Sequence, residues 1–158
     1  MKQKYFLICY CLVALIFLPN PAKAATLYIT PEAGSFNFGS TFTLTVRTDT
    51  EGQAVNAAEA SLGFPTDILE LVKVSASPTF YLQVPGSPAK GNGTVYFGGG
   101  LPTPGYKGGS RVLGILTFRA IRKGQAAVRI TAGKVLLNDG NGTDALAGIG
   151  QAQVTIVP

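Results

Sequence analysis

The chain contains no histidine, the usual acid–base group near neutral pH. Carboxylates are therefore the side chains that remain as candidates for catalysis. The absence of histidine excludes Ser-His-Asp catalysis. Glycoside hydrolysis needs only two carboxylates, for which Glu59 and Glu70 are the candidates. Both fall on the polar positions of alternating runs, where a carboxylate is an ordinary surface residue. The sequence therefore favours a protein that is not an enzyme.

Half of a calcium-binding loop lies near the C-terminal end. Its oxygen-bearing side chains stand at nearly alternate positions: Asp139, Asn141, Thr143 and Asp144. A complete twelve-residue loop would place a glutamate at its last position, where this chain has Gly150. Asp-Gly and Asn-Gly pairs favour tight turns with positive φ. We expect a glycine-rich turn here, with calcium as the weaker alternative, and we expect no cofactor.

Aromatic side chains could also bind a ligand, by stacking on sugar rings. The chain has no tryptophan, and most of its phenylalanines fall on apolar positions of alternating runs. Tyr81 and Tyr106 lie in or near expected loops and are the best candidates for an exposed platform. A tyrosine with a buried ring and a wet hydroxyl is the more common case. Carbohydrate binding by these two residues is therefore an alternative function.

The elements that must position these residues are strands. Apolar residues occupy every second position from Thr41 to Thr48 and again from Ala58 to Phe64, as in strands with one buried face. Similar runs are 26–30, 68–75, 93–98, 111–120, 125–137 and 152–157. Turn residues separate the runs, and no segment has a sustained helical period. Eight or nine short strands predict an all-β sandwich or barrel.

The segment from Pro85 to Gly109 departs from this pattern. It is rich in glycine and contains four of the chain's prolines, two of them in the stretch GGGLPTPG. Proline lacks the N–H donor of a ladder, and glycine weakens strand interiors. We expect a strand that ends near Gly98, followed by a long surface crossover to a strand that begins near Arg111.

The first 24 residues have the three-part layout of a secretory signal peptide. Lys2 and Lys4 precede an uncharged apolar run from Tyr5 to Leu18, and Ala22 and Ala24 suit signal peptidase. This run is shorter than the roughly 20 residues that span a bilayer, so an uncleaved anchor is the lesser alternative. We expect cleavage after Ala24, a single domain over residues 25–158, and a secreted protein that is free or attached to the cell surface.

Removal of the signal changes the composition of the chain. Both cysteines lie within it, which excludes disulfides, a thiol nucleophile and cysteine-based zinc sites from the remainder. Ten basic residues remain against eight acidic ones, a net charge of about +2. No basic cluster is larger than Arg119, Arg122 and Lys123. We therefore expect no nucleic-acid partner, and no membrane span once the signal is cleaved.

The order of the apolar runs and turns resembles the cohesin family. The segments that carry the resemblance are 27–29, 34–36, 42–46, 56–60, 64–65, 68–72, 98–105, 116–120 and 135–143. The GGGLPTPG and VLLNDGNGTD stretches are the most specific of these. The resemblance covers nearly all of residues 25–158 and implies a nine-stranded jelly-roll β-sandwich. The scaffold proteins of this family carry several such domains with linkers, and we expect this chain to depart from them in having one domain.

The resemblance also implies a function. Cohesins bind dockerins, which are small calcium-loaded helical modules, and so assemble proteins outside the cell, often for polysaccharide breakdown. The calcium in such a complex belongs to the dockerin. The binding face would lie on the strands near 55–64, 79–84, 93–98 and 125–133. Its candidate residues are Glu59, Ser61, Tyr81, Tyr96 and Arg129. A polysaccharide-binding module and a structural subunit of an extracellular assembly are the alternatives.

Overall fold

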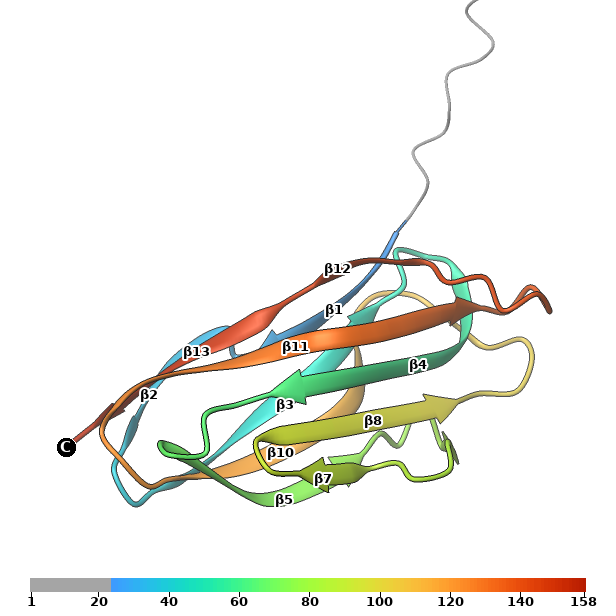
Figure 1. Cartoon of the computed structure of the whole chain (residues 1–158). Helices are drawn as coiled ribbons and strands as arrows, with labels where there is room; N and C mark the ends of the chain where they lie inside the picture. Colours follow the sequence, from blue (N-terminus) through green and yellow to red (C-terminus); the bar gives the residue numbers. More distant parts are fainter. Residues whose placement is uncertain (1–23) are drawn as a thin grey trace, which may run out of the picture.

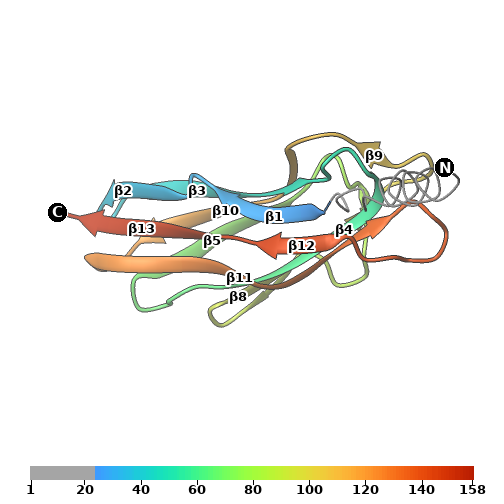
Figure 2. The same ribbon diagram turned by 90° about the horizontal axis from the view of Figure 1, so that it is seen from above.

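The computed structural model describes residues 24–158 and shows two β-sheets packed face to face (Figure 1). The predicted signal segment lies outside the described residues, except for Ala24. No helix within the described range is long and apolar enough to cross a membrane. Figure 2, turned by 90°, shows the β1–β3–β10 layer above the β13–β11–β8 layer. The fold is an all-β sandwich, as the sequence predicts.

Five strands form the first sheet, called sheet A. Their order across the sheet is β12 (Leu146–Ile149), β1 (Ala25–Thr30), β3 (Thr41–Asp49), β10 (Arg111–Ala120) and β5 (Leu69–Ala76). All neighbours are antiparallel except β1 and β12. Their inward residues alternate with outward ones, since every second residue of β3 from Phe42 to Thr48 is buried.

Eight strands form the second sheet, called sheet B. Its main path is β2 (Ala33–Asn37), β13 (Gln151–Val157), β11 (Gly124–Leu137), β4 (Ala54–Gly63), β8 (Thr94–Gly100) and β6 (Leu82–Gln83). Two short strands lie off this path: β7 (Ala89–Gly91) pairs with β8, and β9 (Tyr106–Lys107) pairs with β4. Strand β11 therefore lies beside β4, which lies beside β8.

The chain passes between the sheets at two places where a strand is interrupted. Pro31 and Glu32 separate β1, in sheet A, from β2, in sheet B. Gly150 alone separates β12, in sheet A, from β13, in sheet B. When β12 and β13 are counted as one strand, nine of the strands in the described range have four or more residues. The expectation of a nine-stranded jelly roll is thereby confirmed.

The core fills the space between the sheets. Leu27, Leu44 and Leu116 from sheet A are completely buried, as are Ala60 and Val128 from sheet B. Aromatic rings close one end of the core. Phe36 stacks on Phe42 with ring centroids 4.0 Å apart, and Phe64 meets Phe118 edge-on at 5.1 Å. Such pairs contribute about 0.5–1.5 kcal/mol each beyond burial.

Gly114 on β10 leaves room for a core ring, which gives a stability prediction. An alanine Cβ at this position would lie 2.3 Å from Cε1 of the buried Phe97 ring. Because the ring is held on all sides, Gly114→Ala is expected to lower the free energy of unfolding by about 1–3 kcal/mol. Gly109→Ala is the control, since its Cβ would meet nothing closer than a carboxylate oxygen of Asp49 at 3.8 Å. Equal urea midpoints for the two variants would contradict the prediction.

The structure differs from the sequence expectation around the crossover. Strand β8 continues to Gly100 rather than ending near Gly98, and the connection to β10 contains the two-residue strand β9. The glycines remain in the strand because the backbone of Phe80 packs where a Cβ of Gly99 would stand, at 2.4 Å from the Phe80 carbonyl oxygen. The short strands β2, β7, β9 and β12 were not among the expected runs, and β6 lies in the segment 79–84, which only the resemblance to cohesins indicated.

Candidate functional site

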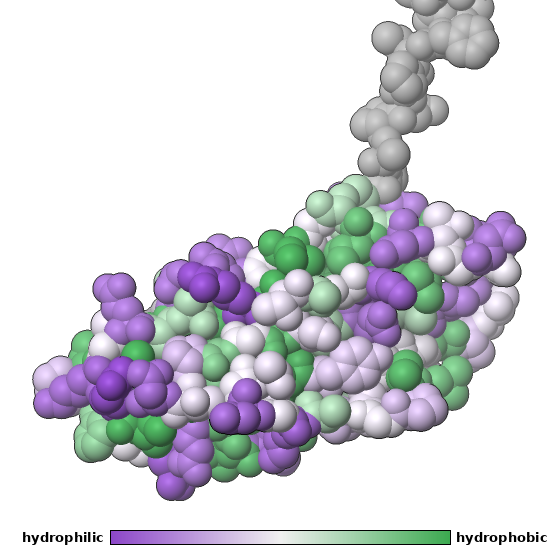
Figure 3. All heavy atoms as spheres, in the orientation of Figure 1, coloured by the Kyte–Doolittle hydropathy of each residue, from purple (hydrophilic) through white to green (hydrophobic). Residues whose placement is uncertain are grey.

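The four chain segments expected to form a binding face are neighbours in sheet B. They correspond to β11, β4, β8 and the region of β6, in that order across the sheet. We call their outward side, with the flanking strand β7, the sheet B face. Figure 3 views it in the orientation of Figure 1, with weakly polar residues over much of its middle. The face is thus built from segments that are far apart in the sequence.

The strand register arranges the outward residues in rows that run across the strands. One row is polar: Arg129, Gly63, Thr94 and Gly91. The next has small residues around one ring: Ala132, Ser61, Tyr96 and Ala89. A charged row follows: Lys134, Glu59 and Gly98. The last is apolar: Leu136, Ala57, Gly100 and Leu82. Small residues dominate, so the face is low in relief and suits a broad contact with another macromolecule.

Tyr96 and Glu59 form a fixed polar pair in the middle of this face. The Tyr96 hydroxyl donates a hydrogen bond of 2.8 Å to Oε2 of Glu59. The Tyr96 ring reaches this acceptor by passing over Gly98, where an added Cβ would lie 2.6 Å from the hydroxyl oxygen. Nζ of Lys134 lies 3.9 Å from Oε1 of Glu59. Three neighbouring strands therefore contribute one side chain each to a connected polar centre.

The tyrosine of this centre has a shifted titration. Partial burial, followed by the hydrogen bond to Glu59 and its negative charge, raises the pKa of Tyr96 above the ordinary value. The folded chain thus keeps the Tyr96 proton at a pH where the unfolded chain has lost it. This contribution to stability is present below the ordinary tyrosine pKa and is lost as the pH rises through the folded pKa.

Because of this shift, the Tyr96 hydroxyl should lose its proton at a higher pH than an ordinary tyrosine does. An alkaline titration followed by the absorbance of tyrosinate measures this late deprotonation. Glu59→Gln should lower the pKa of Tyr96, since the negative charge is removed while a polar side chain of similar size remains. Tyr96→Phe should remove the late deprotonation. A late deprotonation that persists in Tyr96→Phe would show that another residue is responsible.

The remaining candidates for the binding face lie at its margins. Arg129 is exposed on β11, and its Nε donates a hydrogen bond of 2.9 Å to Oε1 of Gln151. Tyr81 precedes β6 and is 57% exposed, next to Leu82, which is 50% exposed. Ser61 is half-buried at the centre of the face. All five predicted residues lie on this face or at its edge.

A buried serine anchors the segment that carries Tyr81. The hydroxyl oxygen of Ser77 accepts backbone N–H groups of Thr79 and Phe80 at 2.9 and 3.1 Å, and the hydroxyl donates to the carbonyl oxygen of Val112. These hydrogen bonds form a turn that places the Phe80 side chain in the core, where it is completely buried. The adjacent Tyr81 and Leu82 consequently point outward at the edge of the sheet B face.

Tyr106 is less available as a stacking platform than Tyr81. It lies in β9, its hydroxyl donates a hydrogen bond of 2.8 Å to the carbonyl oxygen of Gly109, and the guanidinium carbon of Arg111 lies 4.8 Å from its ring centroid. One face of the ring is therefore covered by a cation. Tyr81 is the candidate with the more exposed ring.

The segment from Asp139 to Asp144, which was considered as a calcium site, forms a hydrogen-bonded turn. Oδ1 of Asp139 accepts the N–H of Asn141, and hydrogen bonds from Thr143 and then Asn141 lower the pKa of Asp139. Oδ1 of Asp144 accepts the N–H groups of Val135 and Leu146 at 3.1 and 3.0 Å. Within residues 24–158, no group of three or more His, Cys, Asp or Glu residues could hold a metal ion. Both carboxylates thus hold this segment in place, and calcium binding stays an untested alternative.

The two glutamates considered for glycoside hydrolysis lie on opposite sides of the sandwich. Glu59 faces outward from β4 in sheet B, whereas Glu70 faces outward from β5 in sheet A, with Oε2 3.7 Å from Nη1 of Arg119. Packed sheets are about 10 Å apart, and these side chains point away from each other. Glycosidase carboxylates are at most about 9.5 Å apart, so Glu59 and Glu70 cannot flank one glycosidic bond.

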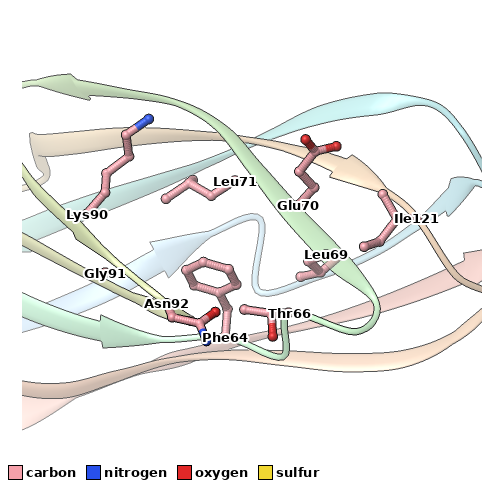
Figure 4. A pocket seen from close by; sticks show the side chains of 10 residues that line it. Phe64, Thr66, Leu69, Glu70, Leu71, Lys90, Gly91, Asn92 and Ile121 are labelled. Atoms are coloured by element: carbon pink, nitrogen blue, oxygen red, sulfur yellow. The ribbon is translucent and has the colours of Figure 1, made fainter.

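A groove between the sheet edges is a feature that the sequence did not indicate. It lies between β5 and the β7–β8 hairpin, has a volume of about 300 Å³, and is shown in Figure 4. Phe64, Leu69 and Leu71 form its floor, and the ends of Lys90 and Glu70 stand at its sides. None of the five candidate residues for the binding face lies in it, although Gly91 from the margin of the sheet B face lines it. Its lining residues come from three separate parts of the chain, so only the fold brings them together.

Comparison of the chain with known proteins gives matches to structures alone. No protein-family model and no curated protein sequence matches it. Solved cohesin modules match in fold. A non-cellulosomal cohesin from the archaeon Archaeoglobus fulgidus has a TM-score of 0.66 at 17% identity, over 85% of this chain and 92% of that one. The identity is low, so the match concerns the fold.

Two further matches come from bacteria. The cohesin module of a Clostridium perfringens family 33 glycoside hydrolase has a TM-score of 0.67 at 14% identity, over 85% of this chain and 97% of that chain. The Coh-OlpC-Doc435 complex of Clostridium thermocellum, a type I cohesin–dockerin complex, has a TM-score of 0.63 at 12% identity, over 85% and 95%. The described chain therefore has a cohesin-like fold, as the resemblance in its sequence predicts.

Proposed function

We propose that this protein is a non-catalytic binding module that recognises a dockerin-type protein through the sheet B face. The observation that carries the proposal is the fold match over 85% of the chain, because three of the matched structures are complexes of a cohesin with a dockerin. The sequence resemblance implies a face on the strands that here form β11, β4 and β8 with the edge segment before β8. These strands are neighbours in one sheet.

The chemistry of the face supports this assignment. Outward residues of β11, β4 and β8 are small or polar apart from Leu136, and a fixed Tyr96–Glu59 pair stands between polar and apolar rows. Interfaces commonly combine such a rigid aromatic side chain with surrounding contacts that exclude water. A helical module could lie across the strands and cover the rows together.

Binding to dockerin modules tests the proposal. Immobilised residues 25–158 are exposed to dockerins encoded in the same genome, and to Doc435 and Doc918, the partners in the matched complexes. The proposal expects retention in calcium and release by a chelator, since the resemblance assigns the calcium to the dockerin. Failure of every dockerin to bind at about 100 µM, where even weak complexes form, would contradict it.

We further propose that the protein acts outside the cell, which the signal-like residues 1–24 support. Mass spectrometry of the protein from culture medium should give a chain that begins at Ala25. Retention of residues 1–24 on a cell-associated protein would contradict cleavage and favour an anchor.

Polysaccharide binding is the second candidate, and the exposed ring of Tyr81 is the observation in its favour. A glycan array tests it, with Tyr81→Ala as the variant and Tyr28→Ala, on the outer side of sheet A, as the control. Glycan binding that disappears only in Tyr81→Ala would support this function. A blank array with the unmodified protein would exclude it for the sugars presented.

A further inference from the structure

A small hollow lies at one end of the sheet B face, where β8 ends in three glycines. Its volume is about 110 Å³, and its lining surface is almost entirely apolar. Its walls include Ala57, Val84, Gly99, Leu136 and the stems of Glu59 and Lys134. It therefore belongs to the face but differs in character from the polar centre beside it.

The packing of this end of the sandwich keeps the hollow open. An added Cβ at Gly99 would lie 2.4 Å from the carbonyl oxygen of Phe80. One at Gly98 would lie 2.6 Å from the hydroxyl oxygen of Tyr96 and 3.1 Å from Cγ2 of Val84. Both positions therefore exclude side chains, which leaves the end of β8 bare. Neighbouring outward positions on β4 are also small, with Ala57 opposite Gly100. The chain provides no side chain of its own to fill the space.

The size and lining of the hollow indicate what can enter it. An engineered apolar protein cavity of about 150 Å³ takes up benzene, so this smaller space suits one branched aliphatic side chain. The apolar surface continues beyond it, because Leu82 and Tyr81 are 50% and 57% exposed. Exposed apolar groups gathered beside a hollow are typical of a contact surface rather than of isolated surface residues.

The ammonium group of Lys134 lies at the rim of the hollow and can donate further hydrogen bonds. Nζ of Lys134 lies 3.9 Å from Oε1 of Glu59, which is beyond hydrogen-bond distance. The other oxygen of Glu59 already accepts the hydroxyl of Tyr96. The side chain of Lys134 is 59% exposed. Its ammonium group can therefore donate to an oxygen that arrives from outside, next to the apolar hollow.

We propose that the hollow receives one leucine-, isoleucine- or valine-type side chain from a helix of the partner, and that an acidic residue beside it pairs with Lys134. The identity of the partner as a dockerin-type module rests on the function proposed above. The preference of the hollow for a branched aliphatic group is independent of that function. Together the two contacts define an apolar–acidic signature that the partner helix must present.

The apolar part is tested by nuclear magnetic resonance with N-acetyl-L-leucinamide as the probe and N-acetylglycinamide as its control. The leucine probe should give saturable shifts at Ala57, Val84, Gly99 and Leu136, in the millimolar range expected of a few buried carbons. Ala57→Leu should remove these shifts by filling the hollow. Ala147→Leu, at an exposed site on β12 in sheet A, should retain them. Absence of the shifts in the unmodified chain would overturn the proposal.

Dockerin titrations separate this inference from the proposed function. Ala57→Leu should weaken dockerin binding by at least about tenfold, as at a well-packed interface position, and Ala147→Leu in sheet A should not. Lys134→Met, which keeps the apolar stem, should weaken dockerin binding and leave the binding of the leucine probe unchanged. Equal dockerin affinity for Ala57→Leu and the unmodified chain would overturn the inference alone. Probe binding without any dockerin binding would overturn the function alone.

Discussion

Replacing Ser61 by arginine is expected to weaken dockerin binding by at least about 30-fold, the effect of losing a central interface contact. Ser61 is an outward residue at the centre of the sheet B face, between Ala132 on β11 and Tyr96 on β8. A long charged side chain there would hold any partner off the surrounding small residues and would have to be desolvated. Calorimetric titration with a dockerin that binds the unmodified chain measures the effect.

A matched control lies on the other side of the sandwich. Thr45 faces outward from β3, between Thr30 and Ile115, in the same kind of central position in sheet A. Thr45→Arg should bind a dockerin with the affinity of the unmodified chain. Both Ser61→Arg and Thr45→Arg should unfold at the same temperature as the unmodified chain. Equal loss of affinity in the two variants would show that the partner is not specific for the sheet B face.

Replacing Phe80 by alanine is expected to lower the free energy of unfolding by about 3–5 kcal/mol, as for other buried phenylalanines. Phe80 is completely buried between the sheets, and its carbonyl oxygen packs against Gly99 at the end of β8. Urea denaturation measures the loss. Such a loss would be a large share of the 5–15 kcal/mol that stabilises an ordinary domain.

The residue that follows gives the control for this variant. Tyr81 is 57% exposed, so Tyr81→Ala should change stability by no more than about 0.5 kcal/mol. Similar urea midpoints for Phe80→Ala and Tyr81→Ala would mean that the segment around Ser77 does not anchor the edge of the face. A large loss in Phe80→Ala alone would confirm that it does.

The sequence predicted strands best where one face of the strand is exposed to solvent and the other is buried. Alternation from Thr41 to Thr48 and from Ala58 to Phe64 predicted β3 and the second half of β4, because period two needs no tertiary information. It failed for the short strands. Strand β2 was not among the expected runs, and it forms because β13 offers it a parallel edge from the far end of the chain. Such pairing is set by tertiary contacts alone.

The candidate site was predictable in outline only. The order of motifs indicated which segments form the face, and the parity of Glu59, Ser61 and Tyr96 placed them outward, as the burial pattern shows. The hollow beside Leu136 was not predictable, because it depends on how Phe80 packs against Gly99. In Phe80-Tyr81-Leu82 no periodicity distinguishes the buried ring from the exposed one. That choice is made by the hydrogen bonds of Ser77.

Calorimetric titration of residues 25–158 with dockerin modules, in calcium and again with a chelator, tests the proposed function most directly. We expect saturable binding of one dockerin per chain in calcium, loss of that binding with the chelator, and at least about a 30-fold loss in Ser61→Arg. An absence of binding heat with every dockerin at about 100 µM, or an unchanged affinity in Ser61→Arg, would contradict recognition of a dockerin by the sheet B face.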